Sequence, residues 1–197
     1  AGYPLAEVPD ARLEKSEPQA PLNDAMKNEG ESSGSCNKLV EEVHALGVER
    51  SLSNLHALAE ATQHEQVQVR VMACRALGWL RDHRAQEHLL EAASDPDSAV
   101  RYAAVSSLAL CGNSVARETL MTCLVGDSDT KVQTAAARVL GWLRFHEATQ
   151  SLIDALQNSS CVLLRAEAVC ALGRLGCSDA RPILFALGDS AAAVRAH

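Results

Sequence analysis

The sequence is poor in the features that mark several common classes of protein. Aromatic residues make up only 3% of its 197 residues, which disfavours the bulky core of a β-sandwich and favours thin, closely packed helices. No run of about 18 apolar residues occurs, so we expect no direct membrane insertion. Basic residues are fewer than acidic ones, 18 against 25, and the net charge is −7. Because nucleic-acid-binding proteins usually carry a basic patch, we expect no nucleic acid partner.

Cysteine is present but lacks the spacing of a metal or redox motif. The number is odd and no pair has CxxC spacing; the residues are Cys36, Cys74, Cys111, Cys123, Cys161, Cys170 and Cys177. Most lie in apolar helical patterns, which indicates small buried thiols in a reducing compartment rather than disulfides. We therefore predict a cytoplasmic protein with no metal and no cofactor. The first residue is not Met, and removal of a signal peptide would instead make this an exported protein.

The first 35 residues differ from the rest of the chain. They carry four prolines, the stretch 30–35 rich in Gly and Ser, and a net charge of −4. No apolar period is sustained there, so residues 1–35 are predicted to be a flexible acidic arm. Its apolar tract from Tyr3 to Pro9 is a candidate for docking on a partner or on the rest of the chain, and a disordered leader is the alternative.

From residue 36 onward the sequence repeats. A leucine between small residues recurs at Leu46, Leu77, Leu108, Leu140 and Leu172, with spacings of 31, 31, 32 and 32 residues. A second register keeps the same steps at Leu58, Leu89, Leu120, Leu152 and Leu184. A constant period of roughly 20 to 50 residues is typical of a stacked repeat array.

Each repeat is expected to be a pair of helices. Around Arg70, for example, Val69, Ala73, Leu77 and Leu80 share one face of a helix, and the pattern recurs around Arg101, Gln133 and Arg165. A second apolar segment opens near Ala85 and its equivalents, and linkers rich in Asp, Ser and Gly follow. Neither helix buries its apolar face alone, so the repeats must stack.

The recurring sequence motif resembles the HEAT-like repeats named after phycobilisome lyases. It runs from Val69-Arg70 through Ala73 and Ala76-Leu77-Gly78 to Ala85, and again from Asp97 through Val100-Arg101 and Ala104. The resemblance implies an all-α, right-handed α-solenoid of about four to five two-helix repeats over residues 36–197. The expected units are 37–63, 64–94, 95–126, 127–158 and 159–190, with a partial unit to 197.

The two ends of the array depart from this pattern. The first unit has Leu39 in place of the arginine and polar Glu41-Glu42, as expected of a capping repeat. The last unit stops where its next helix begins, which leaves apolar Ile183, Leu184 and Leu187 to be covered. A longer native chain or end-to-end self-association would cover them.

Charged residues recur with the repeat and are interpreted first as structural. Arginines stand at Arg70, Arg101, Arg165 and Arg195, and aspartates at Asp95, Asp97, Asp127, Asp129 and Asp189. Charge-assisted bonds between successive turns would hold the repeat spacing. Anion binding by the arginines is the alternative.

Features carried by only some repeats are the candidate binding residues. The segment Leu-Gly-Trp-Leu-Arg occurs at 77–81 and again at 140–144. Trp, Tyr and Arg are enriched in binding hot spots. The residues of these types that lie off the apolar, inward-facing stripe of their helices are the candidates: Trp79, Trp142, Tyr102, Arg75, Arg138 and Arg174. We predict a non-catalytic scaffold or adaptor that binds a protein partner along this face. The alternative is that each Trp covers a seam between adjacent helices.

Three enzymatic alternatives come from similar families. A bilin lyase-like or chaperone-like role would require a groove for a tetrapyrrole, and a HEAT-like DNA glycosylase would require a basic surface. The deoxyhypusine hydroxylase of similar fold binds iron through His-Glu pairs on its inner helices. Here those positions read Val-Arg, Val-Gln or Leu-Arg, and His64-Glu65 and His146-Glu147 lie in linkers. We therefore assign no catalytic and no metal-binding residue.

Overall fold

The computed structural model describes residues 33–111, 114–176, 185–191 and 194. Within these residues the regular structure is helical, as the repeat pattern predicts. The arm predicted at 1–35 lies outside the described part of the chain except for its last three residues, which begin the first helix at Ser33. In the described part, no helix is long and apolar enough to cross a membrane.

The helices come in pairs that follow the repeat. Helices α1 (Ser33–Val48), α3 (Val67–Leu80), α5 (Ser98–Cys111), α7 (Thr130–Trp142) and α9 (Val162–Leu175) open the units. Their partners are α2 (Leu55–Ala61), α4 (Gln86–Ala92), α6 (Ala116–Gly126) and α8 (Thr149–Asn158). Short 3₁₀ turns, η1 (Leu52–Asn54), η2 (His83–Ala85) and η3 (His146–Ala148), lead into α2, α4 and α8.

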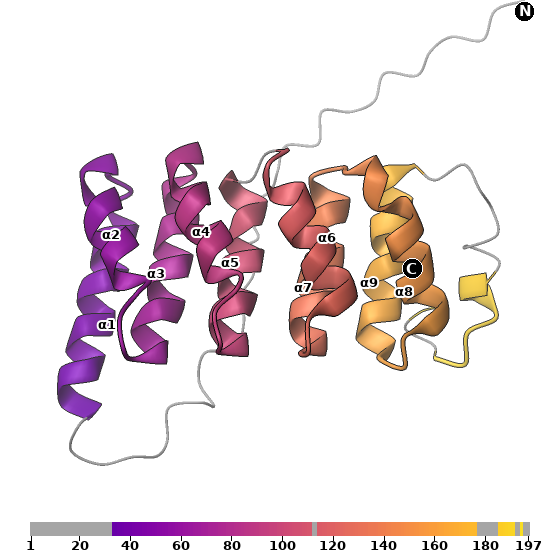
Figure 1. The fold of residues 1–197 in the computed structure, drawn as a ribbon, viewed down its shortest axis with the longest axis horizontal. Helices are drawn as coiled ribbons and strands as arrows, with labels where there is room; N and C mark the ends of the chain where they lie inside the picture. Colours follow the sequence, from indigo (N-terminus) through magenta and orange to yellow (C-terminus); the bar gives the residue numbers. More distant parts are fainter. Residues whose placement is uncertain (1–32, 112–113, 177–184, 192–193, 195–197) are drawn as a thin grey trace, which may run out of the picture. The chain divides into compact units, whose positions relative to one another are not determined.

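The helices form two layers (Figure 1). Helices α3, α5, α7 and α9 pack against one another in sequence, and we call α1 with these four the odd layer. Helices α2, α4, α6 and α8, the even layer, make few contacts with one another and pack mainly on the odd layer. This is the arrangement of an all-α solenoid of two-helix repeats, and it confirms the predicted fold class.

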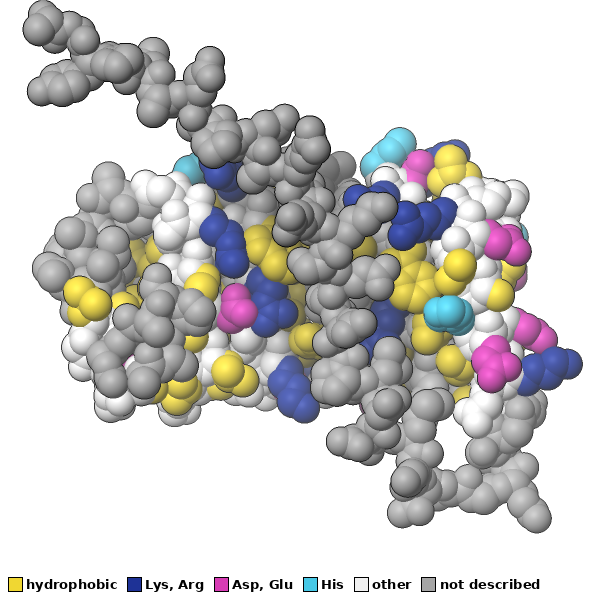
Figure 2. Space-filling model, turned by 180° about the vertical axis from the view of Figure 1, so that it is seen from behind, with side chains coloured by type: hydrophobic (Ala, Val, Ile, Leu, Met, Phe, Trp, Pro, Cys, Tyr) yellow, Lys and Arg dark blue, Asp and Glu magenta, His cyan; other side chains and the backbone are white. Residues whose placement is uncertain are grey.

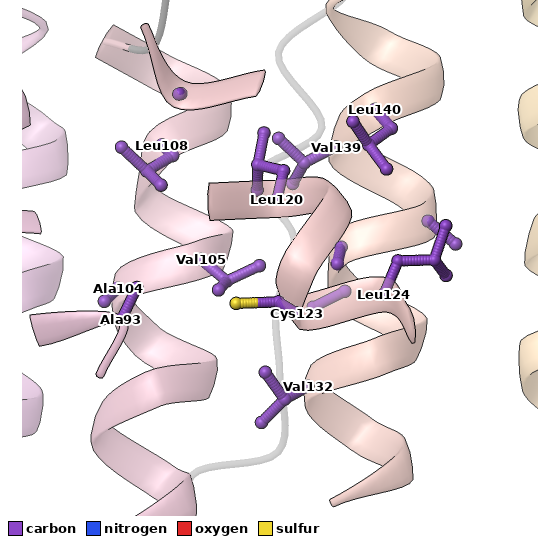
Figure 3. Packing of buried hydrophobic residues seen from close by; sticks show 14 of the residues in the cluster. Ala93, Ala104, Val105, Leu108, Leu120, Cys123, Leu124, Val132, Val139 and Leu140 are labelled. Carbon is purple, nitrogen blue, oxygen red and sulfur yellow. The ribbon is translucent and has the colours of Figure 1, made fainter. Parts of the chain in front are cut away.

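The core consists of the two leucine registers together with the small residues around them. Leu77, Leu108 and Leu140 of the odd layer are fully buried, as are Leu89 and its equivalents of the even layer. Figure 3 shows Leu120, Cys123 and Leu124 of α6 projecting among the side chains of α5 and α7. The apolar stripe read from the sequence is therefore the face along which the layers meet.

Three glycines set the spacing within the odd layer. A Cβ atom on Gly78 would lie 2.8 Å from Ser107 Cβ, and one on Gly141 would lie 2.7 Å from Ala171 Cβ. Gly47 approaches Ala76 in the same way. In these three cases the last residue of a small-Leu-small motif therefore packs on the first residue of the next motif. The equivalent positions of α5 and α7 hold the larger residues Ala109 and Val139.

The predicted ladder between turns is confirmed. The guanidinium groups of Arg70, Arg101 and Arg165 each donate two hydrogen bonds to an aspartate of the next turn: Asp95, Asp127 and Asp189. Each arginine also donates to two carbonyl oxygens of its own turn. Arg195 lies outside the described residues.

Two of the aspartates do not belong to this ladder. Asp97 accepts a hydrogen bond from Ala99 N, and Asp129 accepts one from Lys131 N, each 2.8 Å long. They cap the first turns of α5 and α7, as Asp does when it precedes a helix. The prediction from sequence did not distinguish the capping aspartates from the ladder aspartates, because both recur with the same period.

One rung of the ladder is uncharged on both sides. Gln133 replaces the arginine and Ser159 replaces the aspartate. Gln133 donates to the Asp127 carbonyl of its own turn, at 2.9 Å. Ser159 Oγ accepts from Cys161 N, the same local bond that Asp95 and Asp127 make within their turns. The turn geometry is therefore preserved while the bond between turns is not.

Candidate partner-binding face

All six residues predicted to bind a partner lie on the odd layer. Arg75 and Trp79 are on α3, Tyr102 is on α5, Arg138 and Trp142 are on α7, and Arg174 is on α9. Figure 2 shows this side of the molecule, where arginine and apolar side chains gather. We call the exposed side of the odd layer that these six residues occupy the partner face.

Trp142 is the most prominent aromatic group on the partner face. Half of its surface, 51%, is exposed. The guanidinium carbon of Arg174, on the next helix of the layer, lies 5.8 Å from the centre of its ring. This is a cation–π pair, which orients the two side chains without burying either. The structure thus brings Trp142 and Arg174 together as one exposed group.

Trp79 has the same position in its repeat but a different environment. Its ring lies edge-on to His44 of α1, with centroids 5.3 Å apart, and it is half-buried. Its Cε3 atom would be 2.9 Å from a Cβ on Gly47. Trp79 therefore covers the seam between α1 and α3, the role given above as the alternative for both tryptophans.

Tyr102 and Arg138 take part in a polar chain across three helices. Arg138 Nε donates to Glu167 Oε1 of α9 at 2.9 Å, and a second guanidinium nitrogen lies 2.7 Å from the same oxygen. Burial acts to lower the pKa of Arg138, but the hydrogen bond with Glu167 and the neighbouring Tyr102 of α5 raise it. The chain links α5, α7 and α9 on the partner face. Arg75 is half-buried and its side chain has no partner among the described residues.

The prediction from sequence missed three further arginines, which lie at the C-terminal ends of odd helices. Arg50, Arg81 and Arg144 follow the C-terminal ends of α1, α3 and α7 in left-handed backbone conformations, with φ of 49°, 51° and 55°. Gly176 occupies the equivalent position after α9, with φ of 65°. The left-handed region costs a residue with a Cβ about 1 kcal/mol or more relative to Gly. For Arg81 and Arg144 the signal in the sequence was the arginine that ends each Leu-Gly-Trp-Leu-Arg segment, whereas Arg50 ends Leu-Gly-Val-Glu-Arg.

These three side chains are available to a ligand. Each is exposed and has no side-chain partner among the described residues. Basic groups near the C-terminal end of a helix are favoured by its dipole, which accounts for the sign of their charge.

The two layers carry opposite charge. The five helices of the odd layer hold eight basic residues and three acidic residues, Glu41 and Glu42 of α1 and Glu167 of α9. The four even helices hold five acidic residues and one basic residue, Arg117. The net charge of the chain hides this separation, because it becomes visible only when the helices are sorted into layers.

Two of the described thiols, Cys74 and Cys111, are poorly suited to act as nucleophiles. Burial raises the pKa of the Cys74 thiol to about 12 and that of Cys111 to about 11. A thiol becomes reactive when its pKa is lowered, so these cysteines are inert packing groups. His64 accepts a bond from Gln66 N, and Glu147 pairs with Arg117 at 2.6 Å. The described part of the chain brings no three His, Cys, Asp or Glu side chains together as a metal site.

A hollow of about 580 Å³ lies at the turns that precede α5 and α7. It is lined by Pro96, Asp97, Ser98, Arg101, Ser128, Asp129 and Thr130. Its charged groups are already engaged, because Arg101 belongs to the ladder and both aspartates cap helices. We therefore assign no ligand to it.

The comparisons with known proteins agree with this architecture. The family model of HEAT repeats matches residues 39–109 and 86–162, and the PBS lyase HEAT-like repeat matches 164–187. The chain belongs to the HEAT repeat family. A search of curated protein sequences gives no match.

One solved structure is similar in fold, and a second matches more weakly. The complex of CpcE and CpcF of phycocyanin lyase from Nostoc sp. PCC7120 contains a chain with 22% identity and a TM-score of 0.61. The similarity covers 74% of this chain and 96% of that one. Human deoxyhypusine hydroxylase in complex with glycerol has 19% identity and a TM-score of 0.44, over 80% of this chain and 75% of that one.

Proposed function

We propose that this protein is a scaffold or adaptor that binds a protein partner along the partner face. The observation that carries the proposal is the exposed pair of Trp142 and Arg174. A large aromatic ring with half its surface in water, held beside an arginine on a layer of stacked helices, has the composition of a binding hot spot. Gly141 packs closely on Ala171 and holds α7 and α9 together, so little conformational freedom is lost on binding.

The environments of the six residues divide them into two roles. Trp142 and Arg174 are the direct contacts because both side chains are exposed, and the half-buried Arg75 joins them because its side chain has no partner among the described residues. Trp79, Tyr102 and Arg138 hold the helices in register and contact the partner with their exposed edges. This division refines the prediction from sequence, which treated the two tryptophans as equivalent.

Site-specific photocrosslinking tests the proposal. A benzoylphenylalanine at Ser106 of α5, in the middle of the partner face, is expected to capture a protein from the source lysate. The matched control places the same group at Thr122 of α6, an exposed position of the even layer. Capture at Ser106 should be suppressed by Trp142→Ala and absent at Thr122. Equal capture at both positions, or none at Ser106, would contradict the proposed function.

A second candidate is a bilin lyase-like role. It is favoured by the fold similarity to a chain of the CpcE and CpcF complex of phycocyanin lyase, and that complex also illustrates binding between protein chains. Addition of an open-chain tetrapyrrole to the purified protein tests it. A red-shifted, saturable absorbance change supports this role, and an unchanged spectrum at stoichiometric concentrations rejects it.

A further inference from the structure

We infer that the segment bound by the partner face is an acidic stretch of polypeptide that also carries apolar side chains. This inference rests on the proposed function and specifies the chemistry of the partner. It uses the arginines at the helix ends, which the prediction from sequence did not include.

The charge of the odd layer is the first argument. The sequences of α3, α5 and α7 contain no acidic residue, and the single acidic residue of α9, Glu167, is already bound to Arg138. A carboxylate on a partner lying across these helices would therefore meet no unpaired like charge there. Complementary charge of this kind selects partners and speeds their encounter.

The conformation of three arginines is the second argument. Arg50, Arg81 and Arg144 occupy left-handed positions that Gly would occupy with less strain, as Gly176 does after α9. Their guanidinium groups are exposed and unpaired within the described residues. A guanidinium presents parallel N–H groups that match a carboxylate, so the three form a row of anchors for acidic side chains.

Two of these anchors follow a tryptophan closely in the sequence, which accounts for the apolar part of the partner. Arg81 follows Trp79 by two residues, and Arg144 follows Trp142 by two. An occupant that reaches these arginines therefore passes the exposed parts of both rings. Acidic and apolar side chains in alternation fit this row better than acidic residues alone.

A nucleic acid fits the same face less well. The opposite ends of the odd helices carry the turns with Asp95, Asp97, Asp127 and Asp129. Strong binding of nucleic acid requires many lysine or arginine contacts to phosphate, and Arg70, Arg101, Arg138 and Arg165 of this layer are already paired with carboxylates. A polypeptide of limited length can lie at the arginine ends without reaching the aspartates.

The test measures binding of a fluorescent peptide of Glu-Glu-Leu repeats to the full chain at low salt. The variant Arg81→Gly/Arg144→Gly should weaken binding by about fivefold or more, because two direct charge contacts are lost. Its melting temperature should not fall, since Gly is favoured at both positions. The matched control Lys38→Gln/Lys131→Gln removes the same charge at the other ends of odd helices, and its affinity should stay within about twofold of wild type.

Several outcomes would overturn the inference. One is equal affinity for a Gln-Gln-Leu peptide, and another is equal loss in the two double variants. Tighter binding of oligo-dT than of the acidic peptide would assign the face to nucleic acid. If Glu14→Gln/Glu17→Gln strengthens peptide binding, the occupant is this chain's own N-terminal segment. These results are distinct from failure of the proposed function, which is the absence of any protein crosslinked at Ser106.

Discussion

The guanidinium of Arg101 on α5 donates two hydrogen bonds, each 2.8 Å long, to the carboxylate of Asp127 in the turn before α7. The two side chains are only 13% and 5% exposed. This bond joins one repeat to the next, because most of a helix pair separates the two residues in the sequence. It is therefore a tertiary contact that holds the register of the stack.

Removal of this rung should destabilise the protein. We expect Arg101→Ala to lower the free energy of unfolding by about 2–4 kcal/mol, because Asp127 would remain largely buried without its partner. Gln133→Ala is the matched control on the uncharged rung, with an expected loss of about 1 kcal/mol or less. Urea unfolding followed by circular dichroism measures both. Equal losses would contradict a special role for the charged rung.

The ladder and the buried thiols predict a limited pH range of maximal stability. The hydrogen bond from Arg101 lowers the pKa of Asp127, so this carboxylate stabilises the fold above its unfolded pKa of about 4 and ceases to do so as the pH falls through its folded pKa. Burial raises the pKa of Cys74 to about 12, so its contribution is full below the unfolded pKa of about 8.5 and disappears as the pH rises toward 12.

Two variants test the expected loss of stability at low pH (the acidic limb of the profile) and at high pH (the alkaline limb). In thermal melts across pH, Asp127→Asn should be less stable at neutral pH and should lose less further stability on acidification than wild type. Cys74→Ala should flatten the alkaline limb and leave the acidic limb unchanged. A wild-type profile without a decline on either side would refute the assignment of these groups.

Installing the missing rung should strengthen the stack. Gln133→Arg/Ser159→Asp recreates the pair found in three other repeats, and we expect a gain of about 1 kcal/mol from the bond. The single variants should gain less, because each adds a charge without its partner. A double-mutant cycle measures the coupling between the two positions. Strict additivity would show that the rung had not formed.

Glycine positions should respond in opposite directions to the same substitution. Gly78→Ala places a Cβ 2.8 Å from Ser107 Cβ, so we expect a loss of about 1–3 kcal/mol from forced separation of α3 and α5. Gly173→Ala on α9 meets no atom within 4 Å and should gain about 0.5–1 kcal/mol. Ser107→Gly should partly rescue Gly78→Ala. Failure of that rescue would place the strain elsewhere.

The two tryptophans should separate stability from binding. Trp79→Ala removes the ring that covers the α1–α3 seam and should cost about 2–3 kcal/mol. Trp142→Ala removes a half-exposed ring and should cost about 1 kcal/mol or less while abolishing capture at Ser106. Melting temperature and crosslinking yield together measure the difference. The reverse pattern would exchange the roles of the two residues.

The repeat made the fold predictable, and it limited what was predictable about the site. The positions of Leu77 and Leu89 predicted the core correctly. Each helix packs through one apolar stripe, and the spacing of apolar residues in the sequence reveals that stripe. Trp79 and Trp142 have identical positions in their repeats. Trp79 contacts His44 and approaches Gly47 of the preceding helix α1, whereas Trp142 pairs with Arg174 of the following helix α9 and stays half exposed.

The helix pairs, the period of their stacking and the residues that fill the core could be predicted from the order of residues, because these depend on local periodicity. The folded structure was needed to show that Arg101 bonds to Asp127, that Gly78 sets a helix spacing while Gly173 does not, and that the two layers differ in charge. These properties depend on which side chains meet across repeats. These contacts are set by the packing of helices about thirty residues apart in the sequence, which no local pattern specifies.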